Sequence, residues 1–197
     1  MEPGPGISVL ASCRKVKIVA LALAIGMAVL GAAASLGAAP VYGTREEMLA
    51  RAFPAPAAIE RKTFFLTAGQ RDRASRLAAA KIESSLVVGY VGRRGAEVLG
   101  TAYFDTHMVR TQTETLLITV LPDGSAGAVE VVAFHEPEDY LPRGKWLRLF
   151  EKRKLDGELA VGRGLAHVTG ATLTTRAIAE AVRRVLAIHA VLAEAKP

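Results

Sequence analysis

A long run without charge divides this chain into two parts. No charged residue occurs from Ile18 to Thr44, and Ile18–Leu36 consists almost entirely of Ala, Leu, Val, Ile and Gly. A helix of about 20 apolar residues is long enough to cross the hydrocarbon core of a bilayer. The sequence therefore predicts one N-terminal transmembrane helix, and any folded water-soluble domain must be built from the residues that follow it.

Basic residues directly before this run predict its orientation. Arg14, Lys15 and Lys17 precede it, and such residues favour the cytoplasmic side. We therefore expect residues 1–17 in the cytoplasm, an anchor at residues 18–41, and the C-terminal domain in the periplasm or another extracytoplasmic space. A retained anchor is favoured because signal peptides have apolar cores of only ~7–15 residues. Cleavage of a signal segment remains the alternative.

The cysteine count and the charge distribution exclude several functions. Cys13 is the only cysteine, so the chain has no intrachain disulfide, no Cys-x-x-Cys-His haem motif and no cysteine-based zinc site. The net charge of +6 is scattered along the chain rather than clustered. We therefore interpret the charges as a solvated surface and expect no nucleic-acid binding.

Residues 42–84 are expected to form a linker and a helical lead-in. Capping boxes at Thr44–Glu47 and Thr67–Gln70 predict helices over residues 45–52 and 68–82. The Ala- and Pro-rich stretch between these helices is interpreted as part of the linker.

From Ser85 the pattern is typical of an antiparallel sheet. The predicted strands are Ser85–Val91, Ala96–Thr106, Glu114–Leu121 and Ala128–Phe134. Short turns join them, whereas a parallel connection needs a dozen or more residues. A short helix at Lys145–Lys152 and a final amphipathic helix from about Thr175 to Ala195 complete the pattern. The expected fold class is α+β, with about four antiparallel strands packed with helices.

The segment Thr169–Thr175 is the strongest candidate site. It carries four threonine hydroxyls and Gly170 directly before the final helix, whose first turn contains Arg176 and no acid. A helix start presents unpaired N–H groups and a positive dipole end, so a bound anion would take the usual place of an acidic side chain. The alternative is a plain helix cap, with Thr174 or Thr175 as the N-cap residue.

The sequence Thr169-Gly170-Ala171-Thr172 resembles the [Ser/Thr]-Gly-Ala-[Ser/Thr] motif of the FMN-binding domain family. This family includes the flavin-carrying components of the sodium-translocating NADH:quinone reductase and of the Rnf complex, and the flavin domain of the nitrous oxide reductase regulatory protein. The resemblance implies that a flavin transferase links FMN through its phosphate to Thr172. It also implies that Leu173, Thr174 and Thr175 belong to the cofactor-binding segment.

The resemblance continues upstream and covers roughly residues 85–190. The similar segments are Tyr103–His107, Val131–Pro137, Tyr140–Pro142 and Lys145–Leu147. It implies that residues 85–197 form an FMN-binding domain outside the cytoplasm. One position departs from the family pattern, because Ala166 stands where flavinylated members usually carry an Asp. Either the transferase tolerates Ala166 or FMN is held without a covalent bond.

Other residues have both a functional and a structural interpretation. The resemblance implies that His135 and Glu136 line the isoalloxazine site, and the alternative is a loop that only positions the next helix. Trp146 or Tyr140 could stack on the flavin, although packing of Trp146 in the core is the simpler interpretation. His189 is expected to be a core histidine. Two further histidines have no evident partner in the sequence and are interpreted as surface or loop residues, namely His107 and His167.

Together these features predict an electron-transfer flavoprotein rather than a stand-alone enzyme. The expected partners are a membrane redox protein as electron donor, an extracytoplasmic acceptor, and the flavin transferase. The main alternative is a membrane-anchored binding or assembly module that keeps the fold without working flavin, and Ala166 favours it. A flavin-dependent reductase with its own small substrate is a third alternative.

Overall fold

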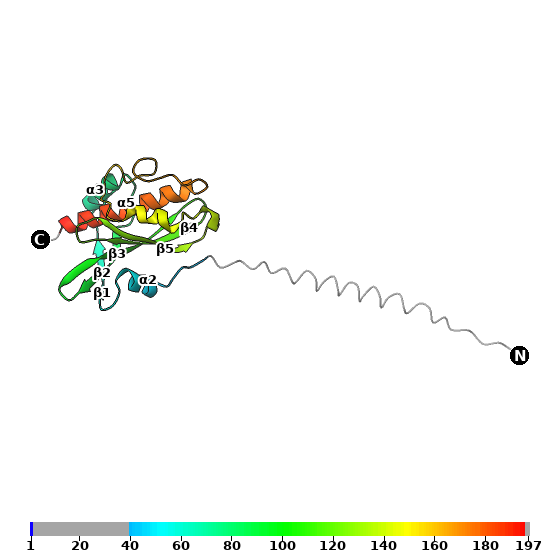
Figure 1. The fold of residues 1–197 in the computed structure, drawn as a ribbon, viewed down its shortest axis with the longest axis horizontal. Coiled ribbons are helices and arrows are strands. Elements are labelled where there is room, and N and C mark those ends of the chain that lie inside the picture. The colour runs from blue at the N-terminus through cyan, green and yellow to red at the C-terminus, as the bar shows by residue number, and fades with distance from the viewer. Residues whose placement is uncertain (2–39, 196–197) are drawn as a thin grey trace. The chain divides into compact units, whose positions relative to one another are not determined.

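Five antiparallel strands form one sheet in chain order (Figure 1). They are β1 (Ala58–Phe65), β2 (Leu86–Arg94), β3 (Glu97–Met108), β4 (Thr113–Val120) and β5 (Ala126–Phe134). Each strand pairs with the next. The predicted α+β class with an antiparallel sheet is confirmed, but the sheet has one strand more than the four expected.

The additional strand is β1, which lies in the segment interpreted as linker. All eight of its residues pair with β2. Its centre reads Glu60-Arg61-Lys62, and most of its residues are exposed. Charged residues are common on edge strands, where they discourage pairing with other chains. β1 therefore lacks the apolar alternation that predicts the other strands.

The computed structural model describes Met1 and residues 40–195. Residues 18–39 of the predicted anchor lie outside this range, and among the described residues no helix is long and apolar enough to cross a bilayer. Pro40–Tyr42 pair with the outer edge of β5, since the Tyr42 amide donates to the Val132 carbonyl at 2.8 Å and Val41 lies opposite Ala133.

Helices cover both faces of the sheet. α2 (Arg45–Ala52) packs on one face, and α3 (Ala68–Ala78) and α5 (Thr172–Glu194) pack on the other. Both predicted capping boxes are present in full. α3 ends four residues earlier than expected, because Ala79 adopts a left-handed conformation with φ of 52°.

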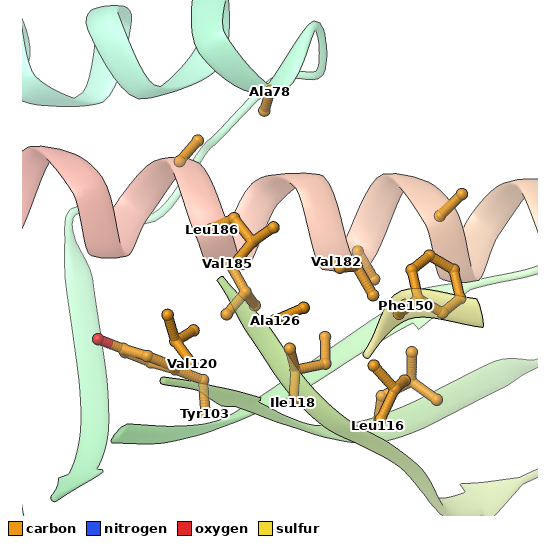
Figure 2. Packing of buried hydrophobic residues seen from close by; sticks show 14 of the residues in the cluster. Ala78, Tyr103, Leu116, Ile118, Val120, Ala126, Phe150, Val182, Val185 and Leu186 are labelled. Carbon is orange, nitrogen blue, oxygen red and sulfur yellow. The ribbon is translucent and has the colours of Figure 1, made fainter. Parts of the chain in front are cut away.

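The main core lies between the sheet and α5. Figure 2 shows Leu116 and Ile118 of β4 pointing toward Val182 and Val185 of α5, with Phe150 beside them. The first three of these side chains are fully buried, and Val185 is 3% exposed. This packing fixes the position of α5 over the sheet and hence the position of its N-terminus.

Short elements connect β5 to α5. They are η1 (Glu138–Tyr140), α4 (Gly144–Leu147) and η2 (Arg148–Phe150), followed by irregular chain up to Ala171. The predicted helix at Lys145–Lys152 is thus replaced by two short helices, and the second ends at Phe150 because Glu151 leaves the helical conformation with ψ of 128°.

Candidate functional site

The N-terminus of α5 is uncapped by side chains. The helix begins at Thr172, three residues before the predicted start, and its N-cap residue Ala171 makes no side-chain hydrogen bond. The first turn contains no acidic residue. The amides of Thr172, Leu173 and Thr174 have no intrahelical acceptor and carry the positive end of the helix dipole, whereas the Thr175 amide donates to the Ala171 carbonyl at 2.9 Å. The helix start therefore keeps its capacity to bind an anion.

The interpretation of this segment as a plain threonine cap is wrong. Thr174 is 1% exposed and Thr175 is fully buried, and both lie inside the first turn rather than at the cap. The Thr175 hydroxyl donates to the carbonyls of Ala171 at 3.0 Å and Thr172 at 3.1 Å. Because the helix starts early, these two threonines face the core and cannot present their hydroxyls to a ligand.

The accessible part of the motif is the stretch from Thr169 to Leu173. Thr169, Gly170 and Thr172 are exposed, and Leu173 is half exposed, whereas Ala171 is buried. Gly170 has φ of +84°, a conformation that glycine adopts without strain. A Cβ built at Gly170 meets no atom within 4 Å, so the backbone there is open to solvent. Two hydroxyls, those of Thr169 and Thr172, are thus available to a ligand.

Trp146 fixes the chain that leads into this motif. Its indole N–H donates to the Ala166 carbonyl at 2.8 Å, and its ring packs edge-to-face on Phe150 with centroids 5.3 Å apart. The side chain is buried. The structure therefore gives Trp146 the core role that was the simpler interpretation, and stacking on a flavin stays a prediction. The Ala166 side chain itself is exposed.

His135 and Glu136 are tied to the loop between β3 and β4. Glu136 Oε1 accepts from the Thr111 amide at 2.8 Å, the Gln112 amide at 3.0 Å and the Thr111 hydroxyl at 3.3 Å. His135 Nδ1 donates to the Thr113 carbonyl at 3.0 Å. The hydrogen bond from the Thr111 amide is the largest cause that lowers the pKa of Glu136 below its ordinary value. The role of His135 and Glu136 next to an isoalloxazine ring stays a prediction.

A Glu136→Ala variant is expected to loosen the β3–β4 loop. Without the carboxylate, the amides of Thr111 and Gln112 lose their acceptor, and their hydrogen exchange should speed up by on the order of tenfold. NMR-detected exchange of these two amides measures the effect. Glu138→Ala, at an exposed position nearby, serves as the control. Unchanged protection in Glu136→Ala would contradict the assigned role.

His107 is not a surface or loop residue, contrary to expectation. It lies on β3, its side chain is only 10% exposed, and its Nδ1 donates to Asp105 Oδ1 at 2.8 Å. Its Nε2 lies 3.3 Å from an oxygen of Glu114, a residue that is fully buried on β4. Arg184 of α5 donates to the same Asp105 oxygen at 2.8 Å. These four residues form the buried polar cluster.

The charges of the buried polar cluster shift its pKa values in opposite directions. Burial alone would lower the pKa of His107, but Asp105 and Glu114 outweigh it, and the pKa is raised. Burial would raise the pKa of Asp105, but His107 and Arg184 outweigh it, and the pKa is lowered. Burial raises the pKa of Glu114, whose oxygens have no hydrogen bond of normal geometry within the described part of the chain.

The sequence contains a signal for this cluster. Asp105 and His107 occupy alternate positions of one strand and so share a face. Glu114 stands directly opposite His107 in the β3–β4 register. The predicted strand ends at Thr106, which places His107 in the loop and hides the pairing.

No group of three or more His, Cys, Asp or Glu side chains in residues 40–195 has the arrangement of a metal site.

The stability of the protein is expected to fall as pH rises from about 6.5, the ordinary histidine pKa. A raised pKa means that protonated His107 stabilises the fold below that pH and that this contribution is lost as pH rises through the folded-state pKa. A His107→Gln variant should lack this decline. Urea unfolding at a series of pH values measures it.

The exposed His167 provides the matched control for this titration. His167→Gln should keep the decline seen in the unaltered protein. An identical pH profile for His107→Gln would show that His107 does not carry the effect.

Comparison with known proteins does not assign a function to the Thr169–Leu173 segment or to the buried polar cluster. No family model and no curated protein sequence matches this chain. The resemblance to the FMN-binding domain family therefore depends on the quoted sequence segments.

Proposed function

We propose that this protein is an extracytoplasmic electron-transfer flavoprotein that carries FMN on Thr172. The observation that carries the proposal is the exposed Thr172 at the first position of a 23-residue helix whose N-terminal amides no side chain caps. That position is also the last residue of the Thr-Gly-Ala-Thr motif. An accessible hydroxyl and a helix start whose amides no side chain caps thus coincide at one residue.

The residues around Thr172 fit a phosphate ester. A phosphate group is favoured at a helix N-terminus by the free amides and by the dipole. The exposed Arg176 lies four residues after Thr172, one turn further along the same side of α5, and adds a positive charge near the helix start. Gly170 adopts the positive φ of +84° that leads the chain into the helix, and the space beside it is open. Thr169, Gly170 and Leu173 are the other accessible residues of the motif.

FMN would supply the redox chemistry, and the chain would supply position and electrostatics. Trp146 and Phe150 hold the segment before the motif against the core, so the attachment point has a fixed base. His135 and Glu136 are the proposed neighbours of the flavin ring. We propose a membrane redox protein as donor, an extracytoplasmic carrier or reductase as acceptor, and an N-terminal membrane helix that holds the domain at the cytoplasmic membrane.

One observation favours the alternative of a binding or assembly module without flavin. Ala166 is exposed and therefore accessible to a modifying enzyme, but it lacks the carboxylate found in flavinylated members of the family that the chain resembles. The Ala166 carbonyl already accepts a hydrogen bond from the Trp146 indole. It therefore does not replace the missing carboxylate as a group for the transferase to recognise.

Co-expression with a flavin transferase tests the proposal. Purified protein is separated by denaturing electrophoresis and viewed under ultraviolet light. A fluorescent band is expected, since an ester-bound flavin survives denaturation. A yellow protein without a fluorescent band would indicate FMN held without the ester and would reject the covalent part of the proposal. A colourless protein would reject the flavoprotein and favour the binding module.

A further inference from the structure

We propose that a cavity under the C-terminal end of α5 binds a small aromatic anion, with the ring inside and the acidic group at the mouth. This site is separate from Thr172. Leu192, which lines the cavity, follows Thr172 by 20 residues in α5, which corresponds to about 30 Å at 1.5 Å per residue. The proposal therefore does not depend on the proposed flavin.

The cavity has the size and the apolar walls of a small-molecule site. Its volume is about 330 Å³, and it lies on the α5 face of the sheet. The apolar wall residues come from four strands or their turns and from α5, namely Phe64, Val91, Val98, Val120, Leu121 and Leu192. Sites for small molecules are usually concave, mostly apolar and provided with a few polar groups. A flat aromatic ring matches such walls better than a sugar or another strongly hydrated ligand.

A tyrosine–histidine pair supplies the polar groups inside the cavity. The Tyr103 hydroxyl and His189 Nδ1 lie 2.8 Å apart, and their rings meet edge-to-face with centroids 5.9 Å apart. Figure 2 shows Tyr103 beside Val120, with its hydroxyl at the edge of the hydrophobic core. Burial raises the pKa of Tyr103, so its hydroxyl stays protonated. The pair therefore places a neutral phenol and a hydrogen-bonded imidazole in the wall of the cavity.

Two cations at the mouth give the site its preference for an anion. Lys62 and Arg93 both line the cavity. They share a single carboxylate, that of Glu60, at 3.3 Å from Lys62 and 3.8 Å from Arg93. No Asp or Glu side chain lines the cavity among the described residues, so the charged groups of its described lining are both cationic. A ligand carboxylate or sulfonate could approach these partly exposed side chains without losing all of its hydration.

Titration calorimetry of the full chain in non-ionic detergent tests the proposal, with 2-naphthoate as the probe. Its neutral analogue 2-naphthamide has a ring of the same size and no charge. We expect saturable binding of naphthoate at one site per chain. A double variant, Lys62→Ala with Arg93→Ala, should weaken naphthoate roughly three- to tenfold and leave naphthamide unchanged.

A second variant tests occupation of the cavity itself. Ala193 is exposed and lines the cavity, so Ala193→Phe should obstruct it without disturbing the core. This variant should weaken both probes. A double variant of Arg61→Ala with Arg94→Ala, at neighbouring positions that do not line the cavity, should leave both affinities unchanged.

Three results would overturn the proposal. The first is that naphthoate shows no saturable binding. The second is that the Lys62/Arg93 and Arg61/Arg94 double variants weaken naphthoate binding equally, and the third is that Ala193→Phe binds both probes with unchanged affinity. Thr172→Val should leave naphthoate binding intact, so failure of the proposed flavin function and failure of this site are distinguishable.

Discussion

A Thr172→Val variant, co-expressed with a flavin transferase, should show complete loss of the ultraviolet-fluorescent band on a denaturing gel. Valine nearly matches threonine in shape but has no hydroxyl to form the phosphoester. Thr172 is exposed at the first position of α5 and does not belong to either hydrophobic cluster of the described residues. The loss would therefore report the missing attachment atom and not a damaged fold. Thr172→Ser, which keeps a hydroxyl, should retain the band.

Thr169 provides the matched control in the same loop. It is also exposed and also carries a hydroxyl. Thr169→Val should keep the fluorescent band, because the motif places the ester on its last residue. A band that persists in Thr172→Val and disappears in Thr169→Val would move the attachment point and refute the assignment. Ala166→Asp, which restores the usual family residue, should increase the labelled fraction.

The largest loss of stability is expected from Asp105→Ala. One oxygen of Asp105 is shared by His107 and Arg184, and the three side chains are only 16%, 10% and 18% exposed. Removing one partner of a buried ion pair leaves the remaining charges without compensation, which typically costs about 3–5 kcal/mol. The free energy of unfolding should fall by about this amount in urea titration near neutral pH.

Two further variants separate this effect from a general loss of charge. Asp139→Ala, at an exposed position, should change stability by less than about 0.5 kcal/mol. Asp105→Asn should be milder than Asp105→Ala, because the amide oxygen can still accept from Arg184. If Asp105→Ala lowered the free energy of unfolding by less than about 1 kcal/mol, water would be solvating the charges of His107 and Arg184, and the prediction would be wrong.

Features that depend on a few neighbouring residues could be predicted from the sequence. The capping boxes at Thr44–Glu47 and Thr67–Gln70 form within four residues, so their hydrogen bonds follow from local spacing alone. The antiparallel order of β2 to β5 follows from turns too short for any other connection. The motif before the last helix is likewise visible in the sequence, since it is contiguous in the chain.

Features that depend on distant parts of the chain were decided by tertiary structure. β1 forms because β2 offers it a free edge, which its own charged sequence does not indicate. α5 starts at Thr172 rather than at the predicted Thr175, because burial of Thr174 and Thr175 against the core outweighs the preference of threonine for the N-cap position. The buried polar cluster exists only because the β3–β4 register and α5 bring Glu114 and Arg184 to His107 and Asp105. Local spacing thus determines hydrogen bonds within one turn, whereas burial and long-range pairing determine which polar groups meet.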